Sequence, residues 1–309
     1  MSVTEGQSTS ESTRDWSEWL GRSETVTDTA SVTAATGLAA ILDRPTPGAG
    51  PDAGEPTTLF PLGHWLQFTP TAAMSELGPD GHPRLGGFMP PLPLPRRMWA
   101  GSSLEFHSPI GVGQELEKTT TIAQITPKNG SSGALCFVEL VHEIRAAGTL
   151  AVTERQTIVY REAVAVDPQA PSPARDPRPD VEAPAGWDWS RSARPTTAQL
   201  FRYSAVTFNS HRIHYDLPYA TEVEGYPRLV VHGPLTATLL LDAFLAERPG
   251  AQLRGFEFSA RSPLFAGELI HLLGRDIEVA DDVAGSHAQE LIALAPTGKP
   301  AVKATVRFD

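Results

Sequence analysis

The stretch VVHGPLTATLLLDAFLAERPG, residues 230–250, predicts one long helix that decides how the second half of the chain folds. Gly233 begins this helix, and Pro249 with Gly250 ends it, because both residue types are common just beyond a helix C-terminus. Apolar side chains recur at helical spacing, so one face has to pack on another layer of structure. That face carries Leu235, Leu239, Leu240 and Phe244.

A polar segment, residues 207–216 with the sequence TFNSHRIHYD, stands shortly before this helix. It contains His211 and His214, and His232 follows at the start of the helix, so three of the nine histidines lie close together. Imidazoles titrate near neutral pH, and a helix N-terminus presents free N–H donors and the positive end of the helix dipole. This combination is typical of a site that moves a proton and stabilises an oxyanion.

The composition narrows the class of protein. A formal net charge of −11 argues against a nucleic-acid-binding protein, because a phosphate backbone requires a basic surface. The single cysteine, Cys136, excludes an intrachain disulfide, and its apolar surroundings predict a buried strand residue. No apolar run reaches the roughly 18 residues of a membrane span. Residues 1–14 predict a disordered tail without a signal peptide, so we expect a cytoplasmic protein that needs no membrane.

The N-terminal half, residues 15–162, begins with helical patterns and continues as a meander of strands. A helix is expected at 29–42 with its N-cap at Thr27-Asp28, and a second, buried helix is expected at 62–77. The Gly- and Pro-rich loop at 78–97 is either a passive connection or a lid, since loops of this length are usually functional. Alternating and β-branched segments then predict antiparallel strands at 103–106, 115–126, 134–146 and 150–160.

Residues 163–195 contain seven prolines and no apolar periodicity, which predicts a linker. The C-terminal half, residues 196–309, then repeats the order of the first half. A helix capped at Thr196 precedes the polar segment and the 233–247 helix. Four strands complete this half, and they are expected at 253–258, 268–279, 286–294 and 301–308.

The two halves share a repeated motif. The segment SPIGVGQEL, residues 108–116, recurs as SPLFAGELI at 262–270, and Leu62-Gly63 corresponds to His232-Gly233. Self-similarity of this kind predicts a duplicated unit, in which one long helix is wrapped by one curved antiparallel sheet. Where the second copy has its polar segment, the first has only apolar side chains, so the second half is expected to hold the chemistry. Those apolar residues are Leu38, Ala39, Ala40 and Leu42.

The polar segment resembles the signature of the MaoC-like, or hydratase-2, group of hotdog-fold hydratases and dehydratases. In that signature an aspartate lies five residues before a histidine, here His214, and a later acid matches Asp216. An HG pair, here residues 232–233, opens the central helix. The longer string at 208–235 resembles a narrower branch, the type-2 hydroxyacyl-thioester dehydratases and the mesaconyl-C4-CoA and itaconyl-CoA hydratases. The segment SELGPDGHP at 75–83 resembles the same two-domain enzymes.

This resemblance covers nearly all of residues 15–309 and implies an α+β fold, a tandem or double hotdog. It implies that residues 15–162 form a degenerate, non-catalytic hotdog and residues 196–309 the catalytic one. The implied activity is the reversible hydration or dehydration of an α,β-unsaturated acyl thioester, which is a hydro-lyase reaction. The implied substrate is a short branched or carboxylated enoyl-CoA such as mesaconyl-C4-CoA or itaconyl-CoA.

The chain departs from the wider signature at Asn209, which stands where the aspartate belongs. An asparagine cannot take a proton, so it could only orient water or the thioester. His214 is then expected to transfer the proton, with help from His211 or Asp216. The Gly233 N–H is expected to meet the thioester oxygen at the start of the helix. The catalytic candidates are therefore His214, Asn209 and Gly233.

The other candidates have a structural interpretation beside the functional one. Asn209 would serve equally as a turn residue, His232 as a partner that ties down the loop, and Asp216 as a cap. Arg212 is either a surface residue or the partner of a substrate carboxylate. Three further arginines are candidates for the phosphates of coenzyme A, although solvated arginines are common. The substrate-binding candidates are His211, Arg212, Asp216, His232, Arg96, Arg97 and Arg261.

Two other functions stay open. One is a dehydratase or other proton-transfer enzyme that acts on a carrier-protein-bound or polyketide-like substrate in a biosynthetic pathway. The other is a non-catalytic acyl-binding protein, whose ligand binding would survive the loss of His214. A hotdog thioesterase fits less well, because its carboxylate lies on or facing the central helix, and here only Asp242 stands well inside that helix.

We expect no metal and no other cofactor, since the two histidines of the polar segment lie outside a helix and hydration requires only amide donors. The expected partner is an acyl-CoA or acyl-carrier-protein thioester, with no nucleic acid. A fused pair of hotdogs supplies within one chain the contact that single hotdogs make with another copy. A homodimer of the fused unit nevertheless stays open.

Overall fold

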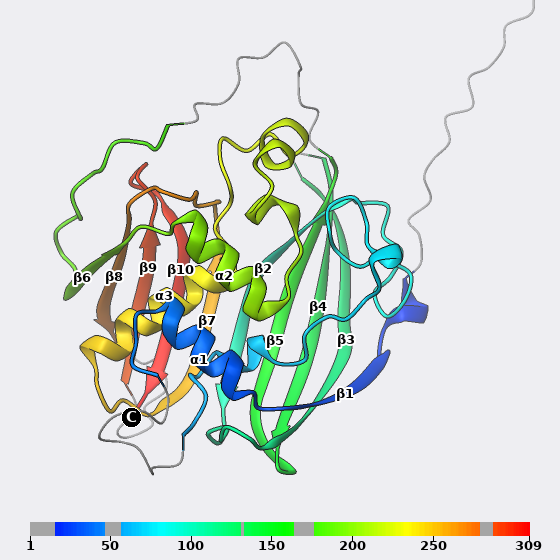
Figure 1. The fold of residues 1–309 in the computed structure, drawn as a ribbon, viewed down its shortest axis with the longest axis horizontal. Coiled ribbons are helices and arrows are strands. Elements are labelled where there is room, and N and C mark those ends of the chain that lie inside the picture. The colour runs from blue at the N-terminus through cyan, green and yellow to red at the C-terminus, as the bar shows by residue number, and fades with distance from the viewer. Residues whose placement is uncertain (1–15, 47–56, 131–132, 164–175, 279–286) are drawn as a thin grey trace, which may run out of the picture.

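One continuous antiparallel sheet runs through both halves of the chain, and the α-helices lie on the same side of it (Figure 1). The computed structural model describes residues 16–46, 57–130, 133–163, 176–278 and 287–309. The predicted tail at 1–14 lies outside these ranges. Among the described residues, none of the helices has both the length and the apolar character that a membrane crossing requires.

The sheet has ten strands, five from each half. It joins the two halves by pairing the first long strand of each, so the sheet is arranged around a central junction. In spatial order the strands are β1 (Ser23–Thr29), β3 (Glu115–Gly130), β4 (Gly133–Ala146), β5 (Thr149–Arg161), β2 (Arg96–Phe106), β7 (Leu253–Ala260), β10 (Pro300–Phe308), β9 (His287–Leu294), β8 (Ile270–Ile277) and β6 (Trp189–Ala193).

Strands β2 and β7 make the junction between the halves. Their register pairs Gly101 with Ser259 and Leu104 with Phe256, and the side chains of Leu104 and Phe256 are each 1% exposed. Gly101 is required there, because a Cβ at this position would lie 2.3 Å from the carbonyl oxygen of Phe258. The two halves therefore share one hydrophobic core instead of folding as separate bodies.

Helix α3 (Gly233–Glu247) has the bounds that the sequence predicted. Its side chains Leu235, Leu240 and Phe244 are fully buried, so it lies within the core of the second half. Helix α2 (Thr197–Thr207) is capped by Thr196, as predicted, through a hydrogen bond that the Thr196 hydroxyl accepts from the Gln199 N–H.

Helix α1 (Val32–Ile41) confirms the first predicted helix but begins later than predicted. Ser31, and not Thr27-Asp28, provides the N-cap by accepting a hydrogen bond from the Ala34 N–H. The residues proposed as the cap belong instead to strand β1, which pairs with β3 at the edge of the sheet. The sequence analysis did not predict this strand.

The prediction of a helix at 62–77 was wrong. Only the 3₁₀ turns η3 (Gly63–Leu66) and η4 (Met74–Glu76) form there. Phe68 has a left-handed backbone with φ 54°, and Pro70 two residues later lacks the N–H that a helix would use. The apolar residues are still buried, with Leu62 at 0% and Leu66 at 3% exposure. Burial alone therefore did not distinguish a helix from a packed irregular segment.

The Pro-rich loop at 78–97 is a packed layer and ends in strand β2. Its residues Leu92 and Leu94 lie against the far end of the first-half sheet, together with Ile122, Val138 and Tyr160. This cluster therefore joins the loop to the side chains of β3, β4 and β5. The loop is therefore structural along this part of its length.

The predicted duplication is visible in the backbone. The turns after β2 and β7 both place a glycine at positive φ, 87° at Gly113 and 83° at Gly267. In each half an isolated β-bridge joins this turn to the segment just before η3 or α3. The bridges join Thr58 with Gly111 and Val230 with Phe265.

The predicted linker at 163–195 ends in structure. Residues 189–193 form β6, which pairs with β8 at the outer edge of the sheet. The Trp189 ring lies over Gly274, where a Cβ would come within 2.2 Å of it, and the Trp189 Nε1–H donates to Gln289. Strand β6 was not predicted because the packing of Trp189 on Gly274 joins residues far apart in the chain and leaves no local sequence pattern.

We predict that Gly101→Ala destabilises the whole protein, because the added methyl group meets backbone atoms that cannot rotate away. The expected loss is about 1–3 kcal/mol in the free energy of unfolding, measured by urea denaturation. Ser103→Ala on the same strand, at an exposed position, is the matched control and should change stability little. Equal stability of the two variants would show that the β2–β7 junction is looser than described.

Candidate active site

Two buried imidazoles stack at the start of helix α3. The ring centroids of His214 and His232 lie 3.6 Å apart with the planes 21° from parallel. The two residues are 7% and 1% exposed. His214 ends the 3₁₀ turn η5 (Arg212–His214), and its Nδ1 lies 2.7 Å from the carbonyl oxygen of Val230. Nδ1 therefore donates, which leaves the lone pair on Nε2 to accept a proton.

His232 joins the two helices of the second half. It is the residue that precedes α3, and its Nε2 lies 2.9 Å from the hydroxyl oxygen of Ser204 on α2. Its Nδ1 is buried and has no hydrogen-bond partner among the described residues. A buried polar atom without a partner is costly, and such atoms are often found where a ligand or water completes the site.

Asn209 and His211 make a tight turn. The side-chain oxygen of Asn209 accepts a hydrogen bond from the His211 N–H at 3.0 Å, which is an Asx turn. The His211 ring lies 5.3 Å from the His214 ring, edge to face. The structure thus gives Asn209 a turn-forming role, and the shape of this turn places His211 beside His214.

Arg212 and Asp216, four residues apart, form an ion pair. The Arg212 Nε and Nη2 donate to Asp216 Oδ2 at 2.9 and 2.7 Å, and the Tyr219 N–H donates to Asp216 Oδ1 at 3.2 Å. The Arg212 Nη1 also donates to the carbonyl oxygen of Pro79. Both candidates therefore hold the polar segment in shape and fix it to the first half.

The three arginines proposed for coenzyme A phosphates differ in their surroundings. Arg96 forms a largely buried ion pair with Glu224 at 2.5 Å, with each side chain 10% exposed. Arg97, the next residue on β2, lies near His82 and His211, and its charge contributes to lowering the pKa of both. Arg261 is exposed beyond the end of β7.

Gly233 is the accessible end of a buried helix. Gly233 and Pro234 are partly exposed, whereas the side chains from Leu235 to Leu241 are buried. The first N–H groups of a helix have no acceptor within the helix, so the helix itself does not use the Gly233 N–H. A Cβ at Gly233 would lie 3.8 Å from the carbonyl oxygen of Trp99, which shows how closely β2 approaches this helix start.

Burial keeps the imidazoles of this cluster neutral. It lowers the pKa of His214 to about 4, an effect that the hydrogen bond to Val230 opposes. Burial and the charge of the neighbouring imidazoles also lower the pKa of His211 and hold that of His232 well below its ordinary range. At neutral pH these rings are proton acceptors, which is the state a general base requires.

Sequence analysis missed two residues that belong to this cluster, Asp80 and His82 of the first half. The His82 ring lies 4.1 Å from the His211 ring, and His82 Nδ1 lies 2.8 Å from Asp80 Oδ2. Both residues stand in the segment SELGPDGHP, whose resemblance was noticed but whose side chains were not assigned a role. No periodicity or spacing connects that segment with residues 207–216.

Asp80, His82 and His211 could also hold a metal ion, because one ligand atom from each lies within 4.8 Å of the others. The guanidinium group of Arg97 lies near all three and contributes to lowering their pKa values. A positive charge at this position repels a cation. The absence of a metal therefore stays our prediction.

The corresponding place in the first half contains a buried, hydrogen-bonded carboxylate. Glu154, 3% exposed, accepts hydrogen bonds from His64 at 3.0 Å, Trp65 at 2.9 Å and Ser102 at 2.6 Å. Burial by itself raises the pKa of Glu154, but these partners, His64 above all, bring it down to about 2. The carboxylate is saturated with donors, so this network stabilises the first half and leaves no group free for acid–base chemistry.

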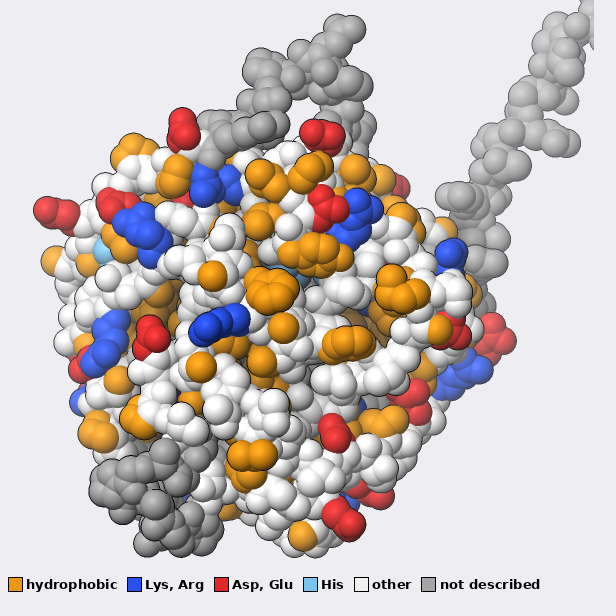
Figure 2. All heavy atoms as spheres, in the orientation of Figure 1, with side chains coloured by type: hydrophobic (Ala, Val, Ile, Leu, Met, Phe, Trp, Pro, Cys, Tyr) orange, Lys and Arg blue, Asp and Glu red, His pale blue; other side chains and the backbone are white. Residues whose placement is uncertain are grey.

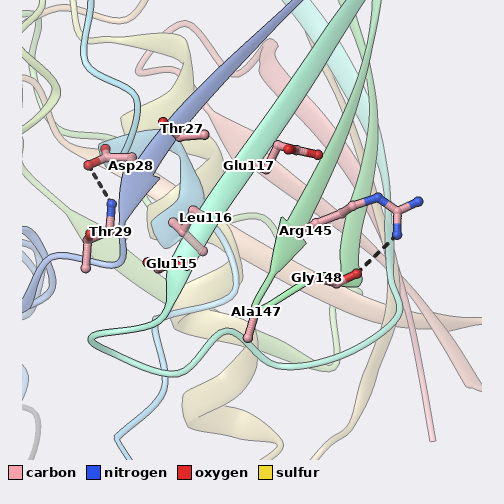
Figure 3. Close-up of a pocket in the computed structure, with 9 residues that line it drawn as sticks. All are labelled: Thr27, Asp28, Thr29, Glu115, Leu116, Glu117, Arg145, Ala147 and Gly148. Atoms are coloured by element: carbon pink, nitrogen blue, oxygen red, sulfur yellow. Dashed lines mark hydrogen bonds between the residues drawn. The ribbon is translucent and has the colours of Figure 1, made fainter.

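A hollow elsewhere on the molecule does not carry this chemistry. A hollow of about 530 Å³ lies between β1, β3 and the β4–β5 turn. Figure 3 shows the residues that line it, among which Asp28 accepts a hydrogen bond from the Thr29 N–H and Arg145 donates one to the Gly148 carbonyl oxygen. Its lining contains no histidine, and its charged side chains lie at the surface. The imidazole cluster lies on other segments of the chain.

Comparison with known proteins identifies the class to which this fold and site belong. Residues 62–266 match the hydroxyacyl-thioester dehydratase type 2 family, and the chain belongs to that family. A mesaconyl-C4-CoA hydratase of Chloroflexus aurantiacus is 43% identical, over 96% of this chain and 99% of the relative. The predictions of the family and of a hydratase or dehydratase that acts on an acyl thioester are thereby confirmed.

Solved structures agree on the fold. A MaoC-like dehydratase from Phytophthora capsici has a TM-score of 0.62 and 17% identity, covering 94% of this chain and 96% of that one. A Mycobacterium tuberculosis protein described as a double hotdog has a TM-score of 0.60 and 14% identity, covering 94% and 96%. The predicted double hotdog is therefore confirmed, although the first hotdog lacks a long central helix.

We predict that protein stability falls as the pH drops from 6.5 to 4. In this range the unfolded chain binds a proton at residue 214 that the folded protein, with its pKa of about 4, does not bind. The free energy of unfolding therefore decreases towards acid, by roughly 3 kcal/mol from this group, and its contribution becomes constant about one pH unit above the unfolded pKa.

Urea denaturation of the wild type and of His214→Gln between pH 4 and 8 would measure this effect. Glutamine does not titrate, so the difference between the two stability curves isolates the contribution of residue 214. A difference that stays constant across the range would contradict the assigned burial of a neutral imidazole.

Proposed function

We propose that this protein catalyses the reversible hydration of a short, carboxylated enoyl-CoA, with mesaconyl-C4-CoA as the first candidate. The observation that carries the proposal is His214, whose basic Nε2 belongs to a buried imidazole stack at the N-terminus of helix α3. The full-length similarity to a mesaconyl-C4-CoA hydratase supports the choice of substrate.

The proposed chemistry begins with water. His214 Nε2 removes a proton while the water oxygen bonds to the β-carbon, and the electron pair of the C=C bond moves onto the thioester oxygen. A proton then reaches the α-carbon and completes the hydration. The pKa of about 4 keeps His214 neutral and able to accept this proton at physiological pH.

The start of helix α3 is proposed to stabilise the charge that develops on the thioester oxygen. The Gly233 N–H is available there, at the positive end of the helix dipole. A single donor of this kind is worth roughly 2.7–4 kcal/mol of barrier in enzymes where it has been measured. His232 supports the geometry, because it fixes the helix start to Ser204 on α2.

Recognition of the substrate is proposed to involve the partly exposed and exposed arginines. Arg97 and Arg261 remain candidates for the coenzyme A phosphates, whereas Arg96 is paired with Glu224 and Arg212 with Asp216. His211 is proposed to contact the acyl group because its ring lies beside His214.

We propose that residues 196–309 hold the catalytic groups named above and that the first half supports them. Asp242 on α3 forms an ion pair with Arg44 of the first half, so it is not free to act as a thioesterase carboxylate. A homodimer stays a prediction. Figure 2 shows apolar side chains spread among charged ones over the helix-bearing face.

We predict that His214→Ala lowers kcat for hydration of mesaconyl-C4-CoA by at least 10²-fold, because the base for water is lost. The assay follows loss of the enoyl thioester absorbance over a panel of enoyl-CoA and enoyl-carrier-protein substrates. His107→Gln, an exposed histidine of the first half, is the control and should retain wild-type activity. Equal rates in the wild type and the His214→Ala variant would refute the assignment.

We predict that prolonged dialysis against a chelator leaves kcat unchanged, because the proposed reaction needs no metal. Metal content and activity should be measured on the same sample before and after dialysis. Parallel loss of bound metal and activity, restored by adding the metal back, would show that Asp80, His82 and His211 are ligands.

A further inference from the structure

The described residues of the second half offer no free carboxylate beside His214. Asn209 stands where the wider signature has an aspartate, and its side-chain oxygen is occupied by the His211 N–H. Asp216 is held by Arg212 and by the Tyr219 N–H. Hydration requires two proton transfers, one from water and one to the α-carbon. Asn209 and Asp216 are therefore not available as the second acid–base group, and the imidazoles beside His214 are the remaining candidates.

The first half supplies an imidazole paired with a carboxylate at this place. His82 Nδ1 donates to Asp80 Oδ2 at 2.8 Å, and the His82 N–H donates to Asp80 Oδ1 at 3.0 Å. The His82 ring then lies 4.1 Å from the His211 ring, and His211 lies 5.3 Å from His214. Of the imidazoles in this cluster, His82 is the one that is hydrogen-bonded to a carboxylate.

The turn that carries the pair is fixed on the polar segment by backbone contacts. The Arg212 N–H donates to the Asp80 carbonyl oxygen at 2.9 Å, and the Ser210 hydroxyl donates to the Gly81 carbonyl oxygen. Gly81 has a φ of +88°, and a Cβ there would lie 1.9 Å from the Ser210 carbonyl oxygen. Only glycine permits this close approach, so the contact between the turn and the polar segment depends on Gly81.

We propose that the Asp80–His82 pair is the second acid–base group of the active site, so that the reaction uses residues from both hotdogs. The inference rests on the proposed hydratase function and deepens it. His214 takes the proton from water as the new C–O bond forms, and His82 gives its proton to the α-carbon as the enolate collapses. His214 then carries the extra proton, His82 has lost one, and exchange with solvent restores both.

The pairing distinguishes His82 from the other imidazoles of the cluster. Asp80 favours the imidazolium form of His82, whereas His214 and His232 are hydrogen-bonded to neutral groups and His211 lies near the charge of Arg97. The His82 side chain is 19% exposed, so it can exchange protons with water between turnovers. The groups that face it are Asp80, the rings of His211 and His214, and the guanidinium of Arg97.

The expected pH profile follows from these neighbours. Burial and the charge of Arg97 lower the pKa of His82 below 6.5, while Asp80 opposes the shift. As the acid for hydration, His82 must be protonated, so wild-type kcat should fall as the pH rises above that pKa. Protonation of His214, with its pKa of about 4, should limit the rate on the acid side.

The experiment compares the wild type with His82→Ala, His82→Gln and Asp80→Asn in the full-length protein, using mesaconyl-C4-CoA over pH 4.5–9. We expect kcat of both His82 variants to fall at least 10²-fold with KM within about threefold, because proton transfer and not binding is lost. Added imidazole should restore part of the activity of His82→Ala. The fall on the alkaline side should be absent from both variants, and Asp80→Asn should lose about tenfold in kcat.

Control variants separate the possible outcomes. His107→Gln should behave as the wild type, and circular dichroism with urea denaturation should show that His82→Gln is folded if His82→Ala is not. Wild-type kcat and an unchanged pH profile in the folded His82 variant, beside an inactive His214→Ala, would overturn this inference and leave the proposed function standing. Failure of the wild type to hydrate any thioester in the panel would instead overturn the proposed function.

Discussion

The pairing of β2 with β7 is the constraint on which the rest of the molecule depends. It joins the strands of both halves into one sheet, and Leu104 and Phe256, which pair across the junction, are each 1% exposed. The same strand brings the carbonyl of Trp99 to the start of α3 and places Arg97 beside the imidazole cluster. The geometry of the site is thus set by a backbone junction that contains none of the proposed catalytic residues.

The two halves have similar backbone turns but different polar side chains. The turns at Gly113 and Gly267 are nearly the same, yet the first half lacks the long helix and fills the corresponding region with the Glu154 network. A carboxylate saturated by His64, Trp65 and Ser102 stabilises but cannot exchange protons. The first half has instead placed its Pro-rich loop over its own sheet and the turn at 78–82 against the site of the second half.

The family signature and the local chemistry of the second half could be predicted from the sequence. The bounds of α3, the N-cap at Thr196 and the grouping of His214 with His232 all rest on residues close together in the chain, where local pattern is informative. An apolar segment without clear periodicity predicted burial but not the type of secondary structure. The apolar residues after Leu62 are buried as expected, yet Phe68 and Pro70 make them turns instead of a helix.

Spacing and residue type are local properties, and from them the sequence alone indicated a duplicated α+β fold and predicted a proton-transferring site before α3. The tertiary structure alone decided what each side chain contacts. Arg96 forms an ion pair with Glu224, and the Asn209 side-chain oxygen accepts a hydrogen bond within a turn. His82 contacts His211, although more than a hundred residues separate them in the chain. Contacts over such separations depend on sheet pairing and on close approach at Gly81, and neither leaves a periodic trace in the sequence.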